Sequence, residues 1–244
     1  MRTQDIRYSH GTLGCLGYLA FDETARDRRP GVLVFHEGLG LGEHIMGKAR
    51  AVADLGYVVL AADMFGNRRE VSKLQEMGKI LGDLRDDLPT LRARARAALA
   101  TLRSVPQVDA TRIAAIGFCF GGSVVLELAR DGADLKAVIS LHGVLSTKAP
   151  AEVDAVKASI LVCTGAEDPL APPDQVAAFQ NEMRNARVRD WQLISYGNTF
   201  HAFTNPIAGP STMPGTLYSE QADRRSWAAV RNFLDEALAA GTRS

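Results

Sequence analysis

The stretch IAAIGFCFGGSVVLELA, residues 113–129, decides the fold because it joins an apolar strand to an apolar helix through a glycine-rich turn. Cys119 lies in this turn, between Gly117 and Gly121, in the pattern Gly-x-Cys-x-Gly. Glycines at these two positions are typical of a sharp strand-to-helix turn that exposes a nucleophilic side chain. We therefore interpret Cys119 as a nucleophile, and the alternative is a small buried cysteine without chemistry.

Strand and helix signals alternate along the rest of the chain. Short apolar, β-rich runs predict strands at 32–35, 58–62, 112–118, 135–141, 159–165 and 190–196. Apolar residues at helical spacing predict helices at 43–56, 84–103, 120–130, 173–185 and 219–240. Strands that are apolar on both faces suit a mostly parallel sheet with helices on both sides. We expect one α/β domain over residues 1–244.

Composition and charge argue against several classes of protein. The chain has 28 basic and 28 acidic residues, so no net charge favours nucleic acid or an anionic membrane surface. No apolar run reaches signal-peptide length at the N-terminus or the roughly 18 residues of a membrane span elsewhere, which favours a cytoplasmic protein. Three cysteines without Cys-x-x-Cys or Cys/His spacing predict neither a disulfide framework nor a zinc site. We expect a small-molecule partner, no cofactor, no metal, and a monomer or homodimer.

In proteins with a nucleophile on such a turn, the catalytic acid and then the catalytic histidine come later in the chain. We therefore expect the base that activates Cys119 to be a histidine with a higher residue number. His142 and His201 are the two candidates. His201 follows the predicted strand 190–196, at a strand end where active-site loops gather, whereas no acid-bearing loop precedes His142. We favour His201 as the base and keep His142 as the alternative.

The acid that orients this base is expected at the end of the preceding strand. Residues 159–165 lead into AEDPLAPP, which places Asp168 directly before Pro169 and Glu167 beside it. A short carboxylate held by a turn suits acceptance of the Nδ1–H of His201, which leaves Nε2 free to act as base. We favour Asp168, and a turn-forming residue without chemistry is the alternative.

Backbone N–H groups at two places are candidates for binding the oxyanion that forms when a carbonyl is attacked. One belongs to Phe120, at the start of the helix, where the helix dipole also stabilises a thiolate. The second is expected from the loop HEGLGLGE, residues 36–43, whose glycines let N–H groups face a substrate. Gly38 and Leu39 are both candidates there.

These segments together resemble the dienelactone hydrolase family across nearly the whole chain. The resemblance is carried by GFCFGG, HEG, GAEDPLAPP, FHAFTNP and YSEQADRRSWAAVRNFL. It implies an α/β-hydrolase fold, a cofactor-independent hydrolysis of carboxylic esters or lactones, and a catalytic triad of Cys119, Asp168 and His201. It also implies that Glu37 interacts with the thiol and moves away when substrate binds. An acid beside a thiol opposes a second negative charge, which holds the cysteine neutral until it is needed.

The resemblance weakens at the substrate contacts. Members of the family hold a substrate carboxylate with arginines, one of them shortly after the catalytic histidine, and this chain has no arginine between His201 and Asn205. Arg68 and Arg69 are candidates to supply the positive charge, and Phe203 and Asn205 are candidates for further substrate contacts. Without a secure carboxylate clamp, a broader preference for esters or lactones is the safer expectation.

Two other classes of function remain as alternatives. Gly38, Gly40 and Gly42 follow a strand, as in a dinucleotide-binding oxidoreductase, but Glu43 stands at the third glycine position of Gly-x-Gly-x-x-Gly and would repel a pyrophosphate. The chain is alternatively a catalytically silent binding protein with an α/β-hydrolase fold, although all three triad positions are intact. The irregular segment 205–218 follows His201 and is long enough to be a functional loop.

Overall fold

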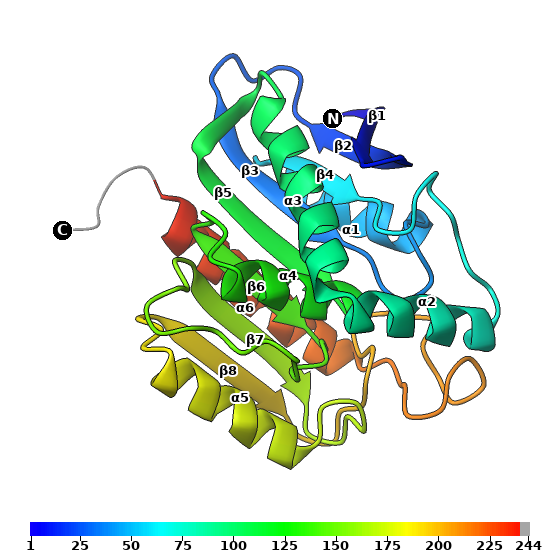
Figure 1. Ribbon diagram of the computed structural model, residues 1–244. Coiled ribbons are helices and arrows are strands. Elements are labelled where there is room, and N and C mark those ends of the chain that lie inside the picture. The colour runs from blue at the N-terminus through cyan, green and yellow to red at the C-terminus, as the bar shows by residue number, and fades with distance from the viewer. Residues whose placement is uncertain (240–244) are drawn as a thin grey trace.

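The computed structural model describes residues 1–239, which form one eight-stranded sheet with helices on both faces (Figure 1). The strands are β1 (Arg2–His10), β2 (Leu13–Phe21), β3 (Arg29–Phe35), β4 (Val58–Ala62), β5 (Val108–Phe118), β6 (Ala137–Leu141), β7 (Ser159–Gly165) and β8 (Trp191–Tyr196). Their order is β1-β2-β4-β3-β5-β6-β7-β8. β2 runs antiparallel to β1 and β4, whereas every pair from β4 to β8 is parallel. The predicted α/β class with a mostly parallel sheet is confirmed.

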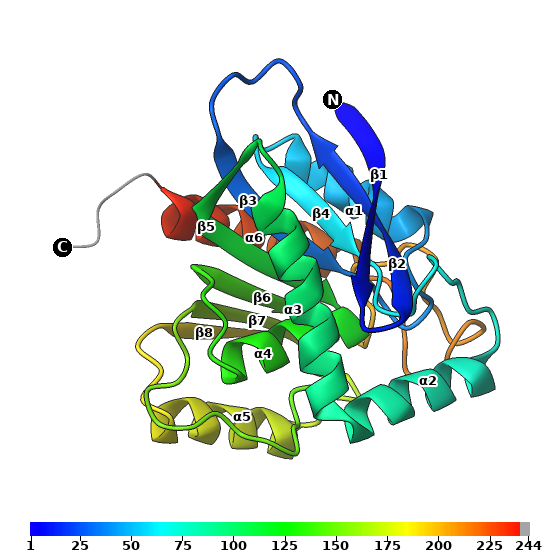
Figure 2. The same cartoon turned by 45° about the horizontal axis from the view of Figure 1, so that its top comes forward.

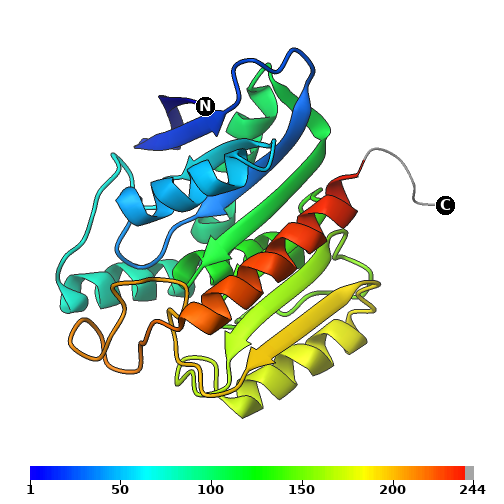
Figure 3. The same ribbon diagram turned by 180° about the vertical axis from the view of Figure 1, so that it is seen from behind.

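The helices cover the two faces of the sheet. They are α1 (Glu43–Ala53), α2 (Leu74–Asp86), α3 (Leu88–Ser104), α4 (Phe120–Arg130), α5 (Pro173–Asn185) and α6 (Glu220–Leu238). Figure 1 shows α3, α4 and α5 in front of the sheet, and Figure 3 shows α1 and α6 on the opposite face. Within residues 1–239, no helix combines the length and the apolar character needed to cross a lipid bilayer.

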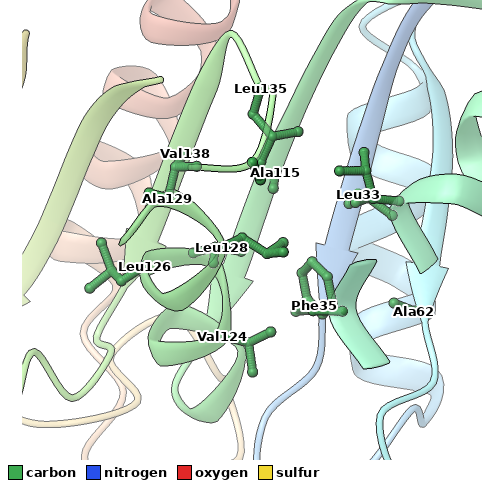
Figure 4. Packing of buried hydrophobic residues seen from close by; sticks show 14 of the residues in the cluster. Leu33, Phe35, Ala62, Ala115, Val124, Leu126, Leu128, Ala129, Leu135 and Val138 are labelled. Atoms are coloured by element: carbon green, nitrogen blue, oxygen red, sulfur yellow. The ribbon is translucent and has the colours of Figure 1, made fainter. Parts of the chain in front are cut away.

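The core lies in two apolar layers, one on each face of the sheet. All residues of α4 are buried, and its charged residues Glu127 and Arg130 are paired with each other and with Arg92 and Glu182. Figure 4 shows α4 above the sheet, with Val124 and Leu128 in the same layer as Leu33 and Phe35 of β3. The helix that follows Cys119 is therefore a rigid element fixed by packing along its whole length.

One prediction of secondary structure is wrong and one pair of strands was not predicted, each for an identifiable reason. The hairpin of β1 and β2 has no clear sequence signal, because β1 reads RTQDIRYSH and is exposed over most of its length. The single helix predicted at 84–103 is wrong, because the segment is divided between α2 and α3. Asp87 is the N-cap of α3 and accepts a hydrogen bond from the Thr90 N–H at 3.1 Å, while Pro89 occupies the first turn of that helix.

The parallel strands place their carboxyl ends at one edge of the sheet. The chain leaves this edge at His36 after β3, at Cys119 after β5, at His142 after β6 and at His201 beyond β8. The orange segment 205–218 and α2 lie at the same edge, at the lower right of Figure 1. Figure 2 shows that α2 extends beyond the end of α3 rather than lying on the sheet. The expected functional loops therefore gather at one end of the molecule.

Candidate active site

The turn at Cys119 is sharp and strained. Cys119 is the N-cap of α4 and has φ 52° and ψ −113°, a backbone conformation that L-residues rarely adopt. The chain passes so closely here that a Cβ on Gly117 would lie 1.9 Å from the carbonyl oxygen of Gly121. A Cβ on Gly121 would lie 2.3 Å from the carbonyl oxygen of Phe35 in β3. The two glycines of the sequence motif are thus required by close backbone contacts, and the Cys119 side chain is left partly exposed.

The structure brings Cys119, His201 and Asp168 together in one row. His201 Nε2 lies 3.1 Å from Cys119 Sγ, and His201 Nδ1 lies 2.8 Å from Asp168 Oδ2. The other carboxylate oxygen of Asp168 accepts a hydrogen bond from the Leu170 N–H at 2.8 Å. Because a carboxylate accepts hydrogen bonds, Nδ1 carries a proton and Nε2 faces the thiol. Glu167, the neighbouring acid, is exposed and takes no part in this row.

The electrostatics of this row favour a charged imidazole. Burial lowers the pKa of His201, but the Cys119 sulfur and the Asp168 carboxylate outweigh that effect and raise the pKa of His201 to about 10. His201 is only 1% exposed and Asp168 only 2%, so water screens the interaction little. The arrangement thus stabilises the imidazolium form of His201 beside the Cys119 sulfur.

The loop after β8 holds His201 in position through backbone contacts with the segment that follows it. The His201 N–H donates to the Gly215 carbonyl at 3.2 Å, and the Leu217 N–H donates to the His201 carbonyl at 3.1 Å. His201 and Thr216 form an isolated parallel β-bridge. The irregular segment 205–218 is therefore attached at its far end to the candidate base.

His142, the alternative base, has a different role in the geometry. The backbone N–H of Cys119 donates to His142 Nδ1 at 3.1 Å, so the proton of the neutral ring is on Nε2, which donates to Thr204 Oγ1 at 2.8 Å. Burial, followed by repulsion from His201, lowers the pKa of His142 well below its usual range. A neutral His142 thus connects the nucleophile turn to the loop of the base. The sequence placed His142 at a strand end but did not indicate this connection.

Glu37 and Cys119 both line one cavity, but the Glu37 carboxyl group is not hydrogen-bonded to the thiol. Its Oε2 accepts a hydrogen bond from Asn205 Nδ2 at 2.8 Å, and its buried Oε1 has no partner among residues 1–239. Burial raises the pKa of Glu37 to about 7. The resemblance implied a contact between Glu37 and the thiol, whereas here the thiol contacts His201 and the carboxyl group contacts Asn205.

Replacing Glu37 by glutamine is expected to stabilise the fold increasingly as the pH rises. The stability that the protonated carboxyl provides is fully present below its ordinary pKa of 4.5 and is lost as the pH rises through about 7. Glutamine is neutral at every pH, so Glu37→Gln should unfold at a higher temperature than the wild type at pH 8.5. The difference should amount to about 3 kcal/mol at pH 8.5 and fall to about 1 kcal/mol or less at pH 5. Thermal unfolding at both pH values measures it, and an equal difference at both would contradict a buried, raised carboxyl.

A cavity of about 490 Å³ opens above Cys119. Glu37, Gly38 and Leu39 line one side of it, and Cys119 and His201 lie at its base. The remaining wall comes from two segments far apart in sequence, residues 70–77 with the start of α2 and residues 205–216. The reactive groups therefore face a space large enough for a small molecule.

Three of the predicted substrate contacts are not at the cavity. Arg68 Nη2 donates to Asp5 Oδ1 at 2.6 Å and to the Gly17 carbonyl at 2.9 Å, which holds this guanidinium against the β1–β2 hairpin. Arg69 forms an ion pair with Glu76 on α2. Phe203 is fully buried and packs edge-on against His142. Of the four predicted contacts, only Asn205 lines the cavity.

The candidate oxyanion donors surround the same space. Among residues 1–239, no acceptor is hydrogen-bonded to the backbone N–H of Phe120, Gly38 or Leu39. His36 fixes the loop that carries two of them, because its Nδ1–H donates to the Glu37 carbonyl at 2.6 Å and its Nε2 accepts from the Met64 N–H at 3.1 Å. The Gly121 N–H donates to the His36 carbonyl at 3.0 Å, which joins this loop to the nucleophile turn. Sequence analysis did not predict this function of His36.

Known proteins with the same fold and with related sequences include hydrolases. The dienelactone hydrolase family matches residues 16–238. The solved structure named m3DLH is 43% identical, with a TM-score of 0.93 and coverage of 98% of this chain and 99% of its own. A dienelactone hydrolase-like promiscuous phosphotriesterase from metagenomic libraries is 40% identical, with a TM-score of 0.91 and coverage of 97% and 98%. An uncharacterized protein of Caenorhabditis elegans is 40% identical over 151 residues, which are 61% of this chain and 95% of that protein.

Proposed function

Because this chain belongs to the dienelactone hydrolase family, we propose that it hydrolyses carboxylic ester or lactone bonds of small molecules with Cys119 as the nucleophile. The observation that carries this proposal is the row of Asp168, His201 and Cys119, joined at 2.8 Å and 3.1 Å at the base of an open cavity. In this proposal His201 is the base and acid, and Asp168 fixes its tautomer.

The first half of the proposed reaction acylates the enzyme. The thiolate of Cys119 attacks the carbonyl carbon, and the electron pair of the C=O bond moves to its oxygen. The N–H groups of Phe120 and of Gly38 or Leu39 bind this oxyanion. When the tetrahedral intermediate collapses, the bond to the alcohol oxygen breaks and the His201 imidazolium protonates the leaving alkoxide. The product of this half is a thioester on Cys119.

The second half returns the enzyme to its starting state. His201, now neutral, takes a proton from a water molecule as that water attacks the thioester carbonyl. The second tetrahedral intermediate uses the same N–H donors, and its collapse releases the carboxylic acid and the Cys119 thiolate. His201 is again an imidazolium beside that thiolate, so no proton is lost over the cycle. No cofactor takes part in any of these steps.

The proposal predicts an acyl group on Cys119 during turnover. The wild-type protein is mixed with an excess of p-nitrophenyl acetate, quenched with acid after a few milliseconds, digested and examined by peptide mass spectrometry. We expect p-nitrophenol release together with one acetyl group on the peptide that contains Cys119. The peptides of Cys15 and Cys163, both buried, should remain unmodified and serve as internal controls. Turnover with the acetyl group on another residue would contradict the mechanism, and no turnover of any ester would favour a silent binding protein.

A further inference from the structure

The walls of the cavity above Cys119 are mainly aliphatic. Its apolar lining residues include Leu39, Val71, Leu74, Met77, Ile207 and Met213. Leu39, Leu74 and Ile207 are 41%, 46% and 69% exposed, so the apolar surface continues from the interior of the cavity to its mouth. Large exposed apolar side chains gathered at one opening are typical of a site for an apolar ligand.

The charged side chains of this lining, apart from the base His201, are both acidic. They are Glu37, which is buried, and Glu70, which is exposed at the rim. Within the described part of the chain, neither a lysine nor an arginine lines the cavity. A substrate carboxylate would therefore leave water without gaining a cationic partner, which costs binding energy.

The nearest cations in the fold have other partners or lie outside the wall. The Lys48 ammonium lowers the pKa of Glu37, but it does not line the cavity, and its Nζ is 3.4 Å from Asp223 and lies over the ring of Phe118. The Arg68 and Arg69 guanidinium groups bind Asp5 and Glu76, as described above. Lys73 follows Ser72 along the chain, but its side chain is exposed and is not part of the lining. None of the described cations is thus placed to hold a substrate carboxylate.

Glu70 also neutralises a positive end of the backbone near the cavity. Gly42 is the N-cap of α1, and a Cβ at Gly42 would lie 2.5 Å from Glu70 Oε2. The Glu70 carboxylate is therefore placed against the N-terminal end of α1, where the helix dipole favours negative charge. A carboxylate at this point lies at the anion-binding end of the helix and repels a second anion that enters the cavity.

We propose that this site takes esters and lactones whose acyl and alcohol groups are uncharged and largely apolar, and that Glu70 excludes substrates that carry a carboxylate. This inference rests on the proposed function, because it specifies the substrates of the same cavity. Glu70 acts on specificity from the rim of the cavity and takes no part in bond breaking.

Three esters of equal chain length test the proposal on the wild-type protein. They are p-nitrophenyl hexanoate, the p-nitrophenyl ester of adipic acid monomethyl ester, and p-nitrophenyl hydrogen adipate. The second has the length and the oxygen atoms of the third but no charge, so it separates charge from polarity. At constant ionic strength and pH 8, we expect kcat/KM for the hydrogen adipate to be about 100-fold lower than for both neutral esters.

Two glutamates permit a matched charge comparison. Glu70→Gln removes the carboxylate at the rim, and we expect the ratio of kcat/KM between hexanoate and hydrogen adipate to fall about 5-fold. Glu23→Gln removes the same charge from an exposed residue two positions after β2, near the opposite edge of the sheet, and should leave this ratio unchanged. Circular dichroism of both variants checks that they are folded.

The outcomes distinguish a failure of this inference from a failure of the proposed function. Equal kcat/KM for the hydrogen adipate and its methyl ester would overturn the inference while leaving ester hydrolysis intact. An equal fall of the ratio in Glu70→Gln and Glu23→Gln would remove Glu70 as the specificity residue. If none of the three esters is hydrolysed, the proposed function itself is wrong, and so is the substrate class inferred from it.

Discussion

Replacing Cys119 by alanine is expected to lower kcat/KM for p-nitrophenyl acetate by about 10⁴-fold or more. Alanine has no atom that attacks the carbonyl, and His201 Nε2, 3.1 Å from the sulfur in the wild type, then has only water to activate. The oxyanion donors and the cavity remain in this variant, so we expect it to hydrolyse the ester faster than buffer alone does. Alanine also fits the turn as cysteine does, since both have a Cβ at the same strained φ of 52°.

Cys15→Ala is the matched control for this variant. Cys15 lies in β2, is 3% exposed, and its sulfur contacts the Leu13 carbonyl and the Tyr8 hydroxyl. Its removal takes away a thiol without touching the candidate site, so the ester hydrolysis rate should stay within about 2-fold of the wild type. Rates of p-nitrophenol release by the wild type and both variants, at matched concentrations and pH 7, test this prediction. Wild-type activity in Cys119→Ala would make the turn a purely structural feature.

Replacing Asp168 by asparagine is expected to lower kcat/KM by about 10³- to 10⁴-fold with little loss of stability. Asp168 Oδ1 accepts from the Leu170 N–H at 2.8 Å, so the asparagine oxygen stays at that position and its NH₂ group faces His201. His201 Nδ1 must then accept this hydrogen bond, which moves the ring proton to Nε2, the nitrogen next to the thiol. A ring protonated at Nε2 is unable to take the proton of the thiol or of water.

The neighbouring acid supplies the control for this substitution. Glu167 is exposed and lies one residue before Asp168, so Glu167→Gln removes the same charge at nearly the same place without altering the tautomer. We expect that variant to keep wild-type activity. Steady-state kinetics and thermal unfolding of both variants test the argument. A loss of similar size in both would mean that negative charge near the site, and not the hydrogen bond to Nδ1, supports the reaction.

Much of the candidate site was predictable because it follows from one topological rule. Cys119, Asp168 and His201 each come shortly after an apolar strand, and the carboxyl ends of parallel strands meet at one edge of a sheet. Their distances were not predictable, nor was the bond between Glu37 and Asn205, because these depend on side-chain positions set by long-range packing. The roles assigned to the three residues remain predictions until the variants are measured.

The errors have physical causes in particular segments. Arg68 was a candidate substrate contact because it lies in a loop at the correct edge, but its partners Asp5 and Gly17 belong to a hairpin that sequence patterning did not predict. Phe203 follows the base by two residues, yet Ala202 between them has φ 57°, and the Phe203 ring packs inside against His142 and Tyr196. A single residue with positive φ reverses the direction of a side chain, and sequence periodicity does not report it.

The reactive groups and the apolar walls of the cavity come from different parts of the fold, and this affects how substrate preference changes in evolution. Cys119, Asp168 and His201 are fixed by turns at the ends of buried strands, where a substitution disturbs folding. The apolar walls come from residues 70–77 and 207–213, which lie outside the sheet and include exposed side chains such as Leu74 and Ile207. Substitutions of the exposed side chains there cost little folding energy. New substrate ranges are therefore accessible to descendants of this chain through two short surface segments, while the reaction itself is inherited unchanged.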